Sequence, residues 1–136
     1  MPCKGQIWLY KEYEFEDGTK RDKYFIAIQD MYKSKKECLF LITTSSYWRF
    51  IPDIKAGCNA EMYLFFIPNK WGTYFKKDTY VLLNFNSVKS FKITNIPSNT
   101  FFSVGDLSPE HYAQLKNCLY KCKDRIPMMY HTMIFK

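Results

Sequence analysis

The chain has 136 residues, which fits a single domain over residues 1–136 and is long enough to bury a hydrophobic core. Hydrophobic residues make up 47% of it, and glycine and proline number only 5 and 6, so a disordered or low-complexity chain is excluded. The net charge of +7 favours a polyanionic partner, either nucleic acid or an acidic protein segment, although a lysine-rich solubilising surface also explains a charge of this size.

The five cysteines include no C-x-x-C pair, which favours reduced and mostly buried thiols in a cytoplasmic protein. Cys118 and Cys122 could share one helix face, but His111 lies two turns earlier, so no local zinc site is expected. The first ten residues lack the apolar run of a signal peptide, and the longest apolar stretch, 62–68, is far short of a membrane span. We therefore expect a cytoplasmic protein with no membrane partner, no metal and no cofactor.

Short apolar runs rich in strand-forming residues follow one another along the first hundred residues. The first run continues as an alternating ribbon toward a turn at Asp17–Gly18. The run at 24–28 is nearly continuous, which predicts burial on both faces of its strand. Residues 45–60 are expected to form a loop. The predicted strands are 5–10, 23–30, 37–44, 61–67, 79–83 and 88–93, with 99–104 as a candidate edge strand.

The pattern changes to helical spacing near residue 108. Ser108 is a typical N-cap and Pro109 suits the first helical position, so a helix is predicted from here through about Lys123. The tail beyond it is apolar enough to pack back or to add a last strand. Many short strands and one late helix predict a mainly β protein, a small and strongly bent antiparallel sheet or barrel. A Gly-rich phosphate loop and βαβ alternation are both missing from the sequence, which argues against P-loop and Rossmann folds.

The segment 18–49 concentrates the residues that suit phosphodiester chemistry. The cations Arg21 and Lys23 lie at the start of one predicted strand, and the hydroxyls of Thr43–Ser46 lie at the end of the next. If the two strands pair, cations and hydroxyls meet at one end of the hairpin, where they could hold a phosphodiester and cleave it.

The order of elements resembles the MazF/PemK family of toxin endoribonucleases, and the resemblance covers nearly the whole chain. It implies an SH3-like barrel with a C-terminal helix, assembled as a homodimer. The matching motifs are Gly5-Gln6-Ile7-Trp8, Lys23–Ile28, Leu41-Ile42-Thr43-Thr44, Lys77–Leu83 and Gly105–Glu110, the last at the start of the helix. Where that family has Arg-Pro, this chain has Lys23-Tyr24.

The resemblance implies a sequence-specific endoribonuclease that cleaves single-stranded RNA without metal and is inhibited by an acidic antitoxin protein. The family's catalytic arginine and threonine correspond to Lys23 and Thr43. Because lysine lacks the bidentate fork of arginine, Arg21 is a further catalytic candidate. The predicted RNA-binding residues are Thr44, Ser45 and Ser46, as phosphate donors, with Trp48 for base stacking and Arg49 as a phosphate clamp.

Two other functions fit the same residues. A catalytically inactive barrel that binds nucleic acid or an acidic protein segment is the alternative favoured by the Lys23-Tyr24 departure. A protein adaptor that uses the aromatic surface around Trp48 and Trp71 is the third. His111 and His131 are expected to be structural or exposed, although either could serve in acid–base catalysis.

Overall fold

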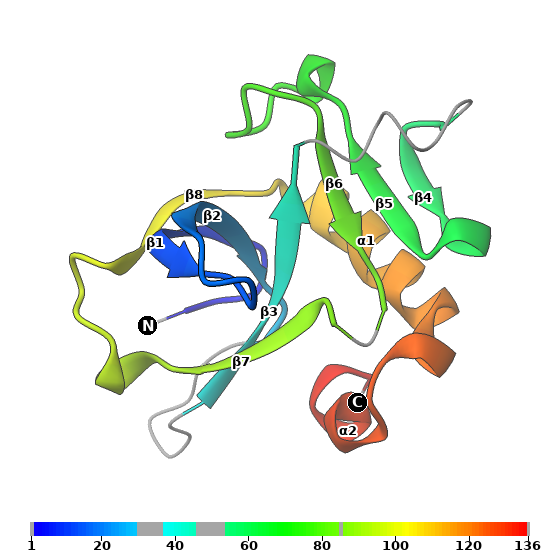
Figure 1. Ribbon diagram of the computed structural model, residues 1–136. Helices are drawn as coiled ribbons and strands as arrows, with labels where there is room; N and C mark the ends of the chain where they lie inside the picture. Colours follow the sequence, from blue (N-terminus) through cyan, green and yellow to red (C-terminus); the bar gives the residue numbers. More distant parts are fainter. Residues whose placement is uncertain (1, 30–36, 46–53, 85, 136) are drawn as a thin grey trace.

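The computed structural model describes residues 2–29, 37–45, 54–84 and 86–135. Every strand pair in this part of the chain is antiparallel, and a helix follows the strands, so the predicted mainly β fold with a C-terminal helix is confirmed (Figure 1). The elements are β1 (Gln6–Glu14), β2 (Lys20–Ala27), β3 (Glu37–Thr44), β4 (Gly57–Asn59), β5 (Leu64–Ile67), β6 (Thr79–Leu82), β7 (Val88–Lys92), β8 (Phe101–Asp106), α1 (Pro109–Lys121) and α2 (His131–Ile134).

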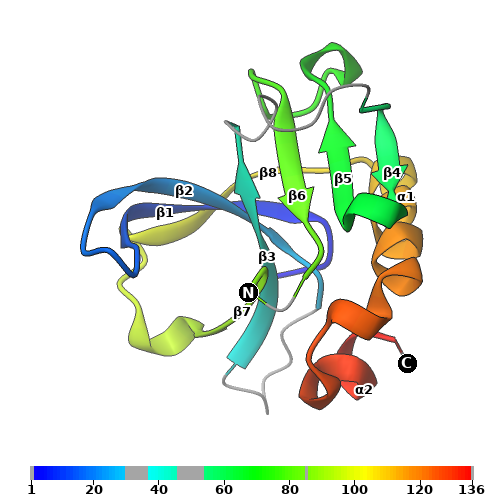
Figure 2. The same cartoon turned by 45° about the vertical axis from the view of Figure 1, so that its right-hand side comes forward.

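Strand β3 lies at the centre of the sheet and joins its two halves (Figure 1). The strand order is β4-β5-β6-β3-β2-β1-β8, and β7 pairs with β3 beside β6. Within the described residues β4 and β8 do not pair with each other, so the bent sheet is not closed into the barrel that the resemblance implied. Strand β4 is only three residues long and α1 packs against it, so the ladder does not continue toward β8 (Figure 2).

The apolar parts of β2 and β3 are buried on both faces, as the apolar run at 24–28 predicts for β2, whereas the first three residues of β2 are exposed. Side chains alternate along a strand. Phe25 and Phe40 therefore belong to a buried aromatic cluster on one face of the bent sheet, together with Trp8 and Phe101. The intervening side chains Ile26, Ile28, Leu39 and Leu41 join a second cluster that packs against α1.

The predicted first strand and the helix are both confirmed, with the strand extended to Glu14. Between Tyr10 and Tyr13 the β1–β2 register shifts, and Glu12 has a φ of 53°. The Asp22 carboxylate Oδ1 accepts the backbone N–H of Glu12 at 3.0 Å and so stabilises this bulge. At the helix, the Ser108 hydroxyl accepts the N–H of His111 at 3.0 Å, which is the expected N-cap bond.

Two predicted regions differ from the structure. The expected loop over 45–60 contains β4, and the expected strand at 61–67 begins only at Leu64, after a short 3₁₀ turn. The tail is helical and adds no strand in its described part. His131 Nε2 lies 3.0 Å from the carbonyl of Lys123 and 2.9 Å from that of Ile126, so it donates to main-chain oxygens and holds the tail at the end of α1.

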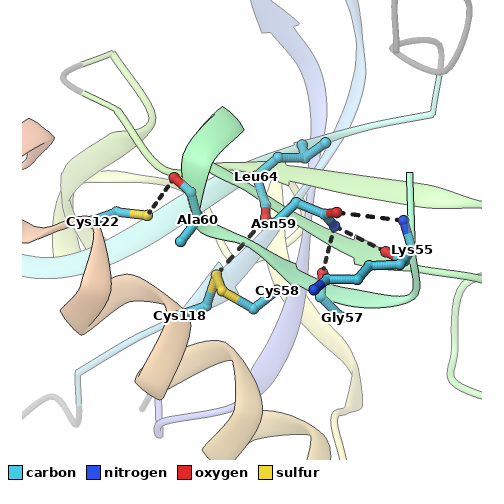
Figure 3. Close-up of a disulfide and its surroundings, with 8 residues drawn as sticks. All are labelled: Lys55, Gly57, Cys58, Asn59, Ala60, Leu64, Cys118 and Cys122. Carbon is cyan, nitrogen blue, oxygen red and sulfur yellow. Dashed lines mark hydrogen bonds between the residues drawn. A yellow bond between two sulfur atoms is a disulfide. The ribbon is translucent and has the colours of Figure 1, made fainter. Parts of the chain in front are cut away.

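A disulfide joins Cys58 of β4 to Cys118 of α1 (Figure 3). The expectation of reduced cysteines is therefore wrong for this pair, whereas Cys3, Cys38 and Cys122 remain thiols. The pairing was not predictable from spacing, because the two residues are 60 positions apart, while their Cα atoms lie 5.4 Å from each other. Burial raises the pKa of the Cys122 thiol to about 11, which makes it a poor nucleophile. No helix in the described residues is long and apolar enough to cross a membrane.

Reducing this disulfide is expected to lower the free energy of unfolding by about 2–4 kcal/mol, because it releases a long loop in the unfolded chain. Urea titrations with and without dithiothreitol measure the difference, and thiol titration of the unfolded, unreduced protein should find three free thiols.

The double variant Cys58→Ala/Cys118→Ala should be insensitive to the reductant, whereas Cys3→Ala should behave as the unmodified protein does. Five titratable thiols in the oxidised protein, or equal stability in both conditions, would contradict this crosslink.

Candidate functional site at the β2–β3 fork

The strands β2 and β3 diverge at one end, and we call this place the β2–β3 fork: residues 22–24 of β2 and 43–45 at the end of β3. The ladder between the two strands runs from Ala27 opposite Phe40 to Phe25 opposite Ile42. One residue further along β3, Thr43 pairs with Val81 of β6, while the earlier part of β2 continues along β1. The separation of the two strands leaves space at the fork.

A cavity of about 380 Å³ occupies the fork, and we call it the lysine cavity. Three lysines and one aspartate line it, so its charged side chains are predominantly positive. Hydroxyl and aromatic groups make up much of the remaining wall. The lining residues are Asp22, Lys23, Tyr24, Thr43, Thr44, Ser45, Tyr74, Phe75, Lys76, Lys77 and Thr79.

Lys23 is half-buried in the cavity wall. Burial lowers the pKa of its ammonium group, and the charge of Arg21 lowers it further. A bound anion would reverse part of this shift, because an opposite charge nearby favours the protonated form. Lys23 is thus a cation that folding has partly desolvated and that an anionic ligand would stabilise.

Arg21 is not among the residues that line the cavity. Its guanidinium carbon lies 4.6 Å from the centroid of the Phe15 ring, a cation–π contact on the β1–β2 ribbon. Arg21 and Lys23 are two residues apart on one strand and lie on the same side of it. Arg21 therefore adds to the positive potential beside the cavity from outside its wall.

Thr43 is 4% exposed, and its hydroxyl donates to the carbonyl of Tyr24 at 2.9 Å. This bond joins β2 to β3 one step beyond the backbone ladder, so the hydroxyl holds the fork together. Thr44 and Ser45 line the cavity as the sequence suggested. The other predicted RNA-binding residues, Ser46, Trp48 and Arg49, lie outside the described residues.

The segment between β5 and β6 supplies the far wall of the cavity, which was not predicted from the sequence. Tyr74, Lys76 and Lys77 come from this segment. The pair of aromatic residues followed by a pair of lysines in Tyr-Phe-Lys-Lys was the available signal, since aromatic and basic side chains together suit nucleic acid. Burial, and then the interaction with the hydroxyl of Tyr74, raise the pKa of Tyr24.

Acid–base groups are sparse in the cavity. Asp22 is the carboxylate in its wall, and one of its oxygens is taken by the Glu12 N–H. His111 and His131 are not among the lining residues. Across the described part of the chain, no group of three or more His, Cys, Asp or Glu side chains could hold a metal ion.

No protein-family model matches the sequence, and a search of curated proteins finds no match either. The MazF/PemK resemblance therefore stays a prediction from motif order.

Replacing Lys23 by methionine is expected to raise the free energy of unfolding at pH 7, because the folded state carries a desolvated ammonium there. The pKa of Lys23 in the folded protein lies below the ordinary value of 10.5. The desolvation penalty on its ammonium is therefore fully present at pH values below that folded pKa. It disappears as the pH rises from the folded pKa to 10.5. Urea unfolding of both proteins across this range measures the effect.

Lys20→Met is the matched control, since Lys20 is exposed on the same strand and should change stability by less than about 0.5 kcal/mol. Equal effects of the two substitutions, or a gain at Lys23 that does not shrink with rising pH, would show that Lys23 is not desolvated.

Thr43→Val is expected to lower the free energy of unfolding by about 1 kcal/mol, because it keeps the shape of the side chain and removes the bond to Tyr24. Thr43→Ser keeps the hydroxyl and separates the loss of this bond from the loss of the methyl group. Urea titration measures both variants. If Thr43→Val is as stable as the unmodified protein, the fork does not depend on this hydroxyl.

Proposed function

We propose that the protein is a toxin-like endoribonuclease that binds single-stranded RNA in the lysine cavity and cleaves it without metal. The observation that carries this proposal is the convergence of Lys23 with Lys76 and Lys77, from segments 53 residues apart in sequence, around hydroxyl-bearing walls. The volume of about 380 Å³ is within the usual range for a small-ligand site, roughly 300–1,000 Å³.

Lysines bind phosphate as point charges, so the expected affinity depends strongly on salt. For a single strand, each neutralised phosphate contributes about 0.7 to the slope of log affinity against log salt. An unpaired strand fits the site better than a duplex, because the cations lie in a concavity and a single strand can bend its backbone into it.

The chemistry uses the RNA as its own nucleophile. The 2′-oxygen attacks the adjacent phosphorus and loses its proton to the amine of Lys23, whose lowered pKa leaves more neutral amine than an exposed lysine has. Lys76 and Lys77 stabilise the charge on the phosphorus-bound oxygens. The bond from phosphorus to the 5′-oxygen breaks, and that oxygen takes the proton of Tyr74. The products are a 2′,3′-cyclic phosphate and a 5′-hydroxyl.

A second function, RNA binding without turnover, is favoured by the position of Thr43. Its hydroxyl is buried and already donates to the Tyr24 carbonyl, so it serves the fold of the fork. The same lysines would hold an acidic protein segment, which makes an acidic antitoxin the proposed competitor of RNA for the cavity. The homodimer stays part of the proposal through the family resemblance, and light scattering of the purified protein tests it.

The decisive experiment incubates the purified protein with labelled, mixed-sequence single-stranded RNA in EDTA. Cleavage to cyclic-phosphate ends is expected, and Lys23→Ala should slow it at least about 100-fold, the usual contribution of a general base. The double variant Lys76→Ala/Lys77→Ala should weaken binding and flatten its salt dependence.

Lys121→Ala, an exposed lysine at the end of α1, is the control and should change neither quantity. Salt-dependent binding without cleavage would favour the second function. Failure to bind RNA at any salt concentration would refute both functions.

A further inference from the structure

A second hollow adjoins the lysine cavity on the other side of Tyr74, which lines both. We call it the aromatic hollow; its volume is about 420 Å³, and Trp71, Tyr74, Asp106 and His111 are among its lining residues. It lies between the segment that follows β5 and the junction of β8 with α1. A chain bound in the lysine cavity can therefore extend past Tyr74 into this hollow.

The rings of the hollow are held in fixed positions. Trp71 and His111 stack with their centroids 4.4 Å apart and their planes 11° from parallel. Behind the indole lie the Phe65 ring, 6.1 Å away between centroids, and Gly57. Rings that are ordered before a ligand arrives lose little further freedom on binding, which favours affinity.

Tyr74 is positioned by a glycine. A Cβ atom built on Gly105 of β8 would lie 3.0 Å from both Cβ and Cδ1 of Tyr74, tighter than most real Cβ contacts, so the ring would have to shift. The missing side chain at this position lets the tyrosine ring lie against the strand. Tyr74 nevertheless remains 38% exposed, so part of it is available to a ligand.

The two cavities differ in charge. None of the residues that line the aromatic hollow is lysine or arginine, whereas three lysines line its neighbour. The hollow instead contains the carboxylate of Asp106, which repels phosphate and accepts hydrogen bonds from N–H groups. Phosphate suits the first cavity, and a flat, uncharged group with N–H donors suits the second.

We infer that the aromatic hollow is a base-binding subsite for a nucleotide next to the phosphate in the lysine cavity, with a preference for guanine. This inference rests on the proposed function. The base stacks against the rings of His111 and Tyr74, and stacking accepts any base. Selectivity comes from Asp106: guanine presents two adjacent N–H donors that one carboxylate can accept, whereas uracil presents one donor between two carbonyl oxygens.

The test measures fluorescence anisotropy with three 2′-O-methyl octanucleotides, which carry equal charge and have no free 2′-hydroxyl to react. They are octauridylate, the same strand with one central guanosine, and a fully abasic ribose-phosphate octamer. The guanosine strand is expected to bind about 5- to 100-fold more tightly than the abasic one, which corresponds to the usual range for stacking one base. It should also bind more tightly than octauridylate.

Two variants assign these differences to the hollow. His111→Ala should reduce the advantage of the guanosine strand over the abasic octamer. Asp106→Asn, an exposed and nearly isosteric change, should keep most of that advantage and lose the preference for guanosine over uridine. Tyr120→Ala is the aromatic control on α1 and should leave the three affinities unchanged, because Tyr120 lines neither cavity.

The outcomes separate this inference from the proposed function. Salt-dependent binding that is equal for the guanosine and abasic strands refutes the subsite and leaves the lysine cavity as a phosphate site. A base preference that survives both His111→Ala and Asp106→Asn also refutes it, since the base would then be bound elsewhere. Failure of all three strands to bind refutes both proposals.

Discussion

The change of partner along β3 is the constraint on which the site depends. Strand β3 pairs with β7 and β2 over most of its length and then with β6 at Thr43. Strand β2 pairs with β1 along its other edge, and its backbone pairing with β3 ends at Phe25 opposite Ile42. The Thr43 hydroxyl bonds the two strands one step beyond that pair. The same turn toward β6 brings the segment before that strand, with Lys76 and Lys77, opposite the end of β2.

The fork combines closely packed strands with a lysine, Lys23, whose charge is disfavoured by burial. Its supports are buried: Phe25 and Thr43 are nearly inaccessible to solvent, and the strands that carry them pack on both faces. Lys23 extends from these strands into a wall where burial disfavours its charge. Proteins tend to place such perturbed groups where a ligand or a reaction uses them, although structural ion pairs also perturb pKa values. No acidic group is among the causes of this shift, and the Lys23 Nζ lies 5.7 Å from the centroid of the Phe15 ring.

Local patterns were enough to predict most of the fold, because strand burial and helix capping depend on neighbours in sequence. The nearly continuous apolar run around Phe25 and the N-cap at Ser108 are examples. The predictions of a closed barrel and of a loop over the residues that contain β4 were wrong, and the prediction for the tail was incomplete. All three features depend on contacts between residues that are distant in sequence. The near wall of the cavity was predictable, since β2 and β3 are successive strands. Its far wall was not, because Tyr74 reaches the fork only through the pairing of β6 with β3.

The disulfide between Cys58 and Cys118 also closes a covalent ring in the chain. Strands β5 to β8 and most of α1 lie on the loop between these residues, so the second half of the sheet belongs to a ring of main chain and sulfur. A single backbone cut inside this ring leaves one connected molecule. Both sides of the aromatic hollow therefore remain tethered after a break in the segment that joins them, and new chain ends could be placed there without releasing a fragment.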